Sequence, residues 1–150
     1  MKLQADIQEC LQLSPDCSKG RHGPIGSWDV SFVTDMSQLF NQEVPGANKF
    51  VGDISEWDVS RVTTMWAMFY SASLFNGDVS KWDVSNVVTM KRMFAGTSPF
   101  SQELCGAWST SKADKTDMFV KSGRLCTTST SATTSAAGKA TQNLDLWAPC

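Results

Sequence analysis

The chain has 150 residues, enough for one domain with a sizeable core, and its 13 basic and 15 acidic residues leave a net charge of −2. This balance lacks the basic footprint of a protein that binds nucleic acid or an anionic membrane surface. The longest unbroken apolar stretch, residues 65–70, is far shorter than the ~20 residues that span a bilayer. We therefore expect no transmembrane segment, and any membrane association to be peripheral and through a partner.

The first twenty residues are expected to form an N-terminal cap. The opening MKLQADIQEC has no apolar core of a signal peptide, which indicates a trimmed form or a protein not secreted by that route. Apolar residues at positions 7, 10, 11 and 13 predict a short amphipathic helix over 5–13. Pro15 ends this helix, because the residue before a proline is pushed out of the helical region. A glycine-rich turn over 20–26 follows and holds the sole histidine, His22, which we expect to be solvated.

A repeated phrase then organises the chain. WDVSFVTDMSQLF begins at Trp28, WDVSRVTTMWAMF at Trp57 and WDVSNVVTMKRMF at Trp82, and a shortened copy begins at Trp108. The steps between these tryptophans are 29, 25 and 26 residues, with the extra residues of the first step around 43–49. A period in this range, with length differences confined to connecting segments, is typical of a solenoid. We expect one capped solenoid domain over 1–126 and a separate tail over 127–150.

Within each repeat, the pattern predicts a strand, a turn and a short helix. Trp-Asp-Val-Ser alternates apolar and polar residues as a half-buried strand does. Val62, Met65, Met68 and Phe69 follow the spacing of a helical apolar stripe, with Ser60 placed to cap that helix. The expected fold class is therefore an α/β repeat solenoid, a leucine-rich-repeat-like stack. Identical positions should align into buried ladders, above all Trp28/Trp57/Trp82/Trp108, Phe40/Phe69/Phe94/Phe119 and Phe50/Phe75/Phe100.

The phrase GDIS-x-WDVS-x-VT-x-M-x-x-MF, present at 52–69 and nearly so at 77–94, resembles the BspA-like repeat. That is a leucine-rich-repeat-like unit of about 25 residues found in bacterial surface proteins and in unicellular eukaryotes including algae. The resemblance covers about residues 20–120, and the C-terminal part is similar to the algal and protist members. It implies an extracytoplasmic interaction scaffold with no shared catalytic residues. The insertion near 45–46 and the lack of a GDIS phrase before Trp28 depart from the pattern.

The five cysteines flank the best repeats rather than lying within them. They are Cys10, Cys17, Cys105, Cys126 and Cys150. This placement favours disulfides that close the two ends of the stack, and hence an oxidising compartment that is extracytoplasmic or organelle-luminal, with secretion or the cell surface as the alternative. We predict the pairs Cys10–Cys17 and Cys105–Cys126. Reduced, buried cysteines are the other interpretation, whereas zinc is disfavoured because CxxC spacing is missing.

Repeated aspartates are the most evident candidate chemistry. They form two ladders, Asp29/Asp58/Asp83 and Asp53/Asp78. Stacked carboxylates can collect calcium or act as an acid–base pair, but each aspartate can also accept hydrogen bonds in an Asx-type turn. Repetition favours the turn, because catalysis needs one singular geometry. With one histidine in the chain, a Ser-His-Asp arrangement would require His22, so we expect no enzyme and no cofactor.

We therefore expect a non-enzymatic structural or protein-interaction module, an accessory subunit docked peripherally on a larger assembly. The alternative is a cell-surface adhesive or carbohydrate-binding domain. The predicted partner surface includes Trp66, because its counterparts Ser37 and Lys91 are polar, and Tyr70, four residues on along the expected helix. The competing interpretations of Trp66 are a scattered exposed aromatic or one covered by the insertion at 43–49.

The tail has two parts. Residues 127–142 are rich in Ser, Thr and Ala and low in apolar bulk, as in a linker. The last eight residues, NLDLWAPC, contain Leu144, Leu146 and Trp147. We expect this short apolar segment either to dock back on the repeats or to bind a partner.

Overall fold

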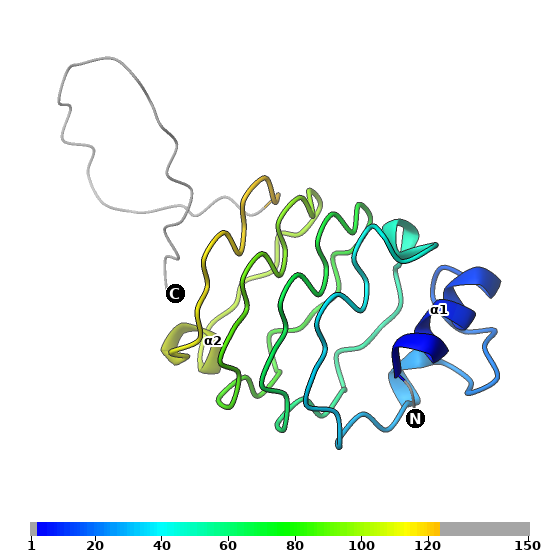
Figure 1. Cartoon of the computed structure of the whole chain (residues 1–150), viewed down its shortest axis with the longest axis horizontal. Helices are drawn as coiled ribbons and strands as arrows, with labels where there is room; N and C mark the ends of the chain where they lie inside the picture. Colours follow the sequence, from blue (N-terminus) through cyan, green and yellow to red (C-terminus); the bar gives the residue numbers. More distant parts are fainter. Residues whose placement is uncertain (1–2, 124–150) are drawn as a thin grey trace, which may run out of the picture.

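The computed structural model describes residues 3–123 of the chain, and successive irregular coils lie side by side along it (Figure 1). We number these coils 1 (20–49), 2 (50–74), 3 (75–99) and 4 (100–123). Four short helical elements are present among the described residues: α1 (Leu3–Leu13), the 3-10 helices η1 (Ile25–Ser27) and η2 (Ala47–Lys49), and α2 (Ala107–Thr110). The rest of the described chain is turns and extended segments.

The expected α/β architecture of strand, turn and short helix is wrong. Within residues 3–123 the pairing of extended backbone is limited to isolated parallel bridges, which join Asp35 to Thr64, Thr64 to Thr89, and Thr89 to Asp114. The short helix expected after each Trp-Asp-Val-Ser phrase is also absent in coils 1 to 3. The chain is therefore not an α/β repeat solenoid, and its likeness to leucine-rich repeats does not extend to the secondary-structure elements.

Consecutive turns replace the expected helix. In coil 2, the backbone N–H of Met68 donates to the carbonyl of Met65 at 3.2 Å, and that of Tyr70 donates to Ala67 at 3.1 Å. Ala67 has a φ of 51°, in the left-handed region, which an α-helix does not tolerate. Turns of this kind place residues i, i+3 and i+4 on the inner side as a helix does. The spacing of apolar residues therefore could not distinguish a helix from consecutive turns.

Hydrogen bonds between coils hold the turns in register. Alternate backbone N–H groups of one coil donate to carbonyls of the next coil at 2.8–3.1 Å. The pairs are Met36–Thr64, Gln38–Trp66, Phe40–Met68 and Gln42–Tyr70; Met65–Thr89, Ala67–Lys91, Phe69–Met93 and Ser71–Ala95; Met90–Asp114, Arg92–Thr116, Phe94–Met118 and Gly96–Val120. Because these donors are satisfied by the neighbouring coil, each coil depends on the next one for its backbone conformation.

The tryptophan ladder is buried, as predicted, and it also links coils through hydrogen bonds. The indole Nε1–H of Trp57 donates to the carbonyl of Ile25 at 2.9 Å, and that of Trp82 donates to Ile54 at 3.1 Å. Trp108 repeats the contact in coil 4, at 3.0 Å from the carbonyl of Val79. These three indoles thus fill the interior of their own coils and donate to a backbone carbonyl of the preceding coil, whereas Trp28 donates to Gly23 within coil 1.

The phenylalanine ladders form the centre of the hydrophobic core, which confirms the prediction that these positions stack. Successive rings of Phe40, Phe69, Phe94 and Phe119 have centroids 5.4, 5.5 and 5.6 Å apart and lie within 3° of parallel. The second ladder, Phe50/Phe75/Phe100, stacks beside the first, with cross-ladder centroid distances of 4.0–4.1 Å. Both ladders and the four repeat tryptophans belong to one buried cluster.

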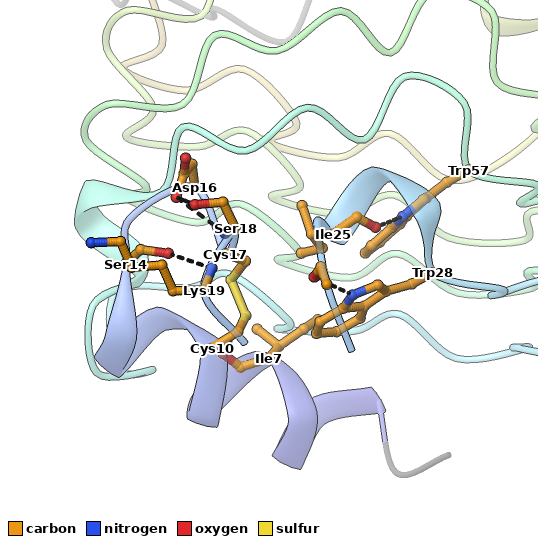
Figure 2. The surroundings of a disulfide bond; sticks show 11 residues. Ile7, Cys10, Ser14, Asp16, Cys17, Ser18, Lys19, Ile25, Trp28 and Trp57 are labelled. Carbon is orange, nitrogen blue, oxygen red and sulfur yellow. Dashed lines mark hydrogen bonds between the residues drawn. A yellow bond between two sulfur atoms is a disulfide. The ribbon is translucent and has the colours of Figure 1, made fainter. Parts of the chain in front are cut away.

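The N-terminal end of the stack is covered by α1, close to the predicted helix. This helix buries Leu3, Ile7, Cys10 and Leu11. The predicted Cys10–Cys17 disulfide is present, with a Cα–Cα distance of 4.9 Å, and it joins α1 to the loop before coil 1 (Figure 2).

The insertion at 43–49 packs against the same helix. Gly46 lies in the left-handed region at φ 88°, and a Cβ added there would be 2.9 Å from the carbonyl oxygen of Leu11. The extra residues of the first repeat therefore form part of the contact between coil 1 and the cap.

Candidate functional site

Trp66 lies on the outer side of the turns of coil 2. Its side chain is 40% exposed, and its counterparts in coils 1 and 3, Ser37 and Lys91, are half-buried and exposed. The insertion at 43–49 therefore does not bury it. Tyr70 is half-buried in the same run of turns, but the two residues do not share a helix face, since left-handed Ala67 lies between them. We call residues 64–72 the Trp66 ridge.

The sequence analysis missed a second exposed aromatic residue, Phe32. Its side chain is 75% exposed, and the Arg61 guanidinium of coil 2 lies 5.1 Å from its ring centroid, in a cation–π contact. The counterparts of Phe32 are Arg61 and Asn86, so the signal that identified Trp66, an aromatic in a polar ladder, was present here too. Phe32 thus adds a second aromatic group to the outer surface.

The aspartate ladders form Asx turns, as the repetition indicated. In each, a carboxylate oxygen accepts the backbone N–H of the residue two positions on, at 2.8–3.1 Å. The pairs are Asp16–Ser18, Asp29–Ser31, Asp35–Ser37, Asp53–Ser55, Asp58–Ser60, Asp78–Ser80, Asp83–Ser85 and Asp114–Thr116. Within residues 3–123, no three carboxylate, histidine or cysteine groups gather closely enough to hold a metal ion. The observed role of these carboxylates is to close turns.

These turns also set the ionisation of their carboxylates. The hydroxyl and backbone N–H of Ser60 lower the pKa of Asp58, and Ser85 does the same for Asp83. At Asp114, the hydroxyl and N–H of Thr116, assisted by Lys91, lower the pKa to about 2. These carboxylates are therefore charged at neutral pH and hold their protons too weakly to act as general acids there.

One buried carboxylate anchors the cap. Asp6 of α1 is 7% exposed, and its Oδ1 lies 2.8 Å from Nη2 of Arg21 and 3.2 Å from Nε2 of His22. The hydrogen bond from Arg21 is the largest cause of its lowered pKa. His22 is exposed, as predicted, and its ring lies edge-on to Trp28. This cluster ties α1 to the turn before coil 1.

Shallow hollows open on the surface of the described residues, and two of them contain charged side chains. One, of ≈ 420 Å³, lies between the disulfide loop and η1 and includes Asp16, Asp53 and Glu56. The other, of ≈ 550 Å³, lies beside α2 and includes Lys81 and Glu103. Asp16 and Asp53 already accept hydrogen bonds within their own turns, so the first hollow presents carboxylates that have partners.

The remaining predicted site residues fall at or beyond the end of the described chain. Cys105 is not a free thiol, but Cys126, its predicted partner, lies outside the described residues, so this pairing stays a prediction. Leu144, Leu146 and Trp147 lie outside them as well. None of the helices in residues 3–123 has the length and hydropathy needed to span a bilayer.

Comparisons with known proteins place the chain in a family. No curated protein matches it, and no solved structure matches it. Residues 8–133 match the model of a family described as a Mycoplasma protein of unknown function, DUF285. This match covers the second half of α1, the disulfide loop, all four coils and the first residues of the tail. The chain belongs to the DUF285 family.

Proposed function

We propose that the protein is a non-enzymatic interaction module of the BspA-like repeat type, an accessory subunit that docks peripherally on a larger assembly. The observation that carries this proposal is the position of Trp66. A tryptophan that is 40% exposed stands where the neighbouring coils carry Ser37 and Lys91, so the stacking that requires the repeat tryptophans does not require this one. Tryptophan and tyrosine are enriched among the residues that dominate binding energy.

The packing of the interior and the engagement of the carboxylates support a binding role for the outer surface. The interior is packed with aromatic rings and methionines in one cluster. The ladder aspartates are engaged in turns, and Asp6 is engaged by Arg21 and His22. Functional contacts are thus left to the outer side chains, and the Trp66 ridge offers the largest apolar ring there beside Phe32.

The cap disulfide supports the proposed compartment. Disulfides persist in oxidising compartments, so the Cys10–Cys17 bond supports an extracytoplasmic or organelle-luminal location, with secretion or the cell surface as the alternative. Charged residues make up 19% of the chain, and a surface with few charges also suits lasting contact with another protein.

The test uses a substitution that the chain itself supplies. Trp66→Ser copies Ser37 of coil 1, and the matched control Phe32→Asn copies Asn86 of coil 3. Each tagged variant is used to retrieve partners from the native source, and its unfolding free energy is measured. We expect Trp66→Ser to lose the retained partner while the free energy of unfolding falls by no more than about 1–2 kcal/mol, because part of the side chain is already exposed. We expect Phe32→Asn to keep the partner. Equal retention by all forms, or a loss of several kcal/mol for Trp66→Ser, would contradict the proposal.

The second candidate is an adhesive or carbohydrate-binding domain, which the exposed Phe32 ring beside Arg61 favours. A glycan array separates the two candidates. Binding to a defined sugar that Phe32→Asn abolishes and Trp66→Ser preserves would support adhesion over protein docking.

A further inference from the structure

Coil 1 has an unpaired backbone edge on the side away from coil 2. In coil 2, the carbonyls of Thr64 and Trp66 each accept an N–H from the preceding coil, at 3.0 and 2.9 Å. The corresponding carbonyls of coil 1 belong to Asp35 and Ser37, and neither accepts a hydrogen bond from residues 3–123. The N–H of Thr34, whose counterpart in coil 2 donates to coil 1, also has no acceptor within that range. Residues 34–37 thus present one backbone donor and two acceptors at this edge.

The N-terminal cap covers the apolar end of coil 1 without pairing with this edge. The loop after α1 meets the stack elsewhere, where the N–H of Val51 donates to the carbonyl of Pro15 at 3.1 Å. Thr34 and Asp35 are exposed, and Ser37 is half-buried. The edge is therefore accessible, and an edge of this kind can pair with one further extended segment.

The contact between coils 3 and 4 indicates which segment fits. The bridges between coils are parallel, so an added segment would run parallel to coil 1. In coil 4, Asp114 stands at the repeat position of Asp35, and Nζ of Lys91 in coil 3 lies 3.1 Å from its Oδ2. Oδ1 of Asp114 accepts the N–H of Thr116, as Oδ1 of Asp35 accepts that of Ser37 at 2.8 Å. The second carboxylate oxygen of Asp35 is thus placed to bind a lysine of the added segment.

A second copy of this chain is a poor source for that segment. The stretch that carries the matching lysine, residues 88–95, is already paired with coils 2 and 4 of its own stack. The donors that coil 4 would offer at the opposite end include those of Lys115 and Phe119, and both residues already have interactions. The segment is therefore expected to come from another protein.

We propose that residues 34–37 of coil 1 bind an extended, lysine-bearing segment of a partner protein as one added parallel strand. Alternate N–H groups of the segment donate to the carbonyls of Asp35 and Ser37, and one of its carbonyls accepts from Thr34. Its lysine binds the Asp35 carboxylate. This assignment rests on the proposed interaction function, but it does not use the Trp66 side chain, so the two can fail separately.

The probe is a capped synthetic peptide, VTMKRMFA, which copies residues 88–95. In the chain itself, the N–H groups of Met90 and Arg92 donate to coil 4 at 2.8 and 3.1 Å, beside the Lys91 contact. The peptide is titrated to millimolar concentration into the isotope-labelled full chain, and amide shifts are recorded. We expect saturable shifts at residues 34–38. N-methylation of the two donor positions of the peptide should weaken binding at least about tenfold, because both hydrogen bonds are lost.

A substitution that the chain supplies tests the role of the charge. Asp35→Thr copies Thr64 and Thr89 and keeps a side-chain oxygen at the turn. It should weaken binding of the lysine peptide about two- to fivefold, the range for an exposed ion pair. A peptide with serine in place of the lysine should bind both forms equally. The matched control Asp29→Thr removes another exposed carboxylate of coil 1 and should leave binding unchanged.

The contrary outcomes are equally specific. Absence of saturable shifts, shifts confined to another surface, or equal binding of the N-methylated peptide overturns the proposal. Protection of the Thr34 amide from hydrogen exchange without peptide also overturns it: the chain itself occupies the edge if protection is independent of concentration, and a second copy does if it rises. If Trp66→Ser loses the native partner while the peptide does not bind, the proposed function stands and this edge is refuted.

Discussion

Trp82→Phe tests whether the indole ladder stabilises the stack by linking coils. Trp82 is 2% exposed, lies 6.5 Å from Trp57 with the rings within 6° of parallel, and donates its Nε1–H to Ile54 at 3.1 Å. Phenylalanine keeps an aromatic ring there but removes the donor and part of the buried volume. The lost hydrogen bond costs about 1 kcal/mol, because the Ile54 carbonyl still accepts the backbone N–H of Trp57. The smaller ring adds about 1–2 kcal/mol.

The expected loss for Trp82→Phe is therefore about 2–3 kcal/mol. For a domain of this size, that corresponds to a decrease in Tm of roughly 10 °C. Urea unfolding under non-reducing conditions, followed by circular dichroism, measures the change. The matched control is Trp66→Phe, the same chemical change at an exposed tryptophan, which should stay within about 0.5 kcal/mol. If the two variants lose equal stability, the argument that the buried indoles link the coils is refuted.

Three further predictions follow from particular contacts. Gly52→Ala should destabilise the fold by about 1–3 kcal/mol in urea unfolding, because the added Cβ would lie 2.5 Å from Cε2 of Phe50 and 2.9 Å from Cγ2 of Ile25; a neutral effect would contradict this close packing. Cys10→Ser with Cys17→Ser should lower the unfolding free energy by about 2.5 kcal/mol, the value for so short a loop, in urea unfolding without a reductant; an unchanged free energy would contradict a stabilising role for this disulfide. Stability should fall with acid: the lowered pKa of Asp114, about 2, contributes stability that is present above the ordinary value of 3.8 and is lost as the pH falls towards 2. Asp114→Asn should flatten that dependence in unfolding measured from pH 5 to pH 2, whereas an identical pH profile would exclude this carboxylate.

The sequence by itself determined which side chains point inward. Trp57, Val59, Met65 and Phe69 are buried as the periodic pattern required, because any backbone that stacks these repeats must remove the same apolar groups from water. Contacts between residues close in sequence could also be predicted. Asp58 and its equivalents have a serine two positions on, which is the arrangement of an Asx turn, and the Cys10–Cys17 pair is close enough in sequence to be predicted.

The tertiary structure determined the conformation of the backbone. Turns and a helix both bring residues i, i+3 and i+4 to one side, so the apolar pattern of residues 62–69 fits either one. The choice rests on the N–H of Met65, which finds its acceptor at Thr89 in the neighbouring coil instead of four residues back. Left-handed Gln38, Ala67 and Arg92 occupy the same position in coils 1, 2 and 3, and none of these residue types favours that conformation. Hydrogen bonds between coils hold them there, and such bonds exist only once the coils have stacked.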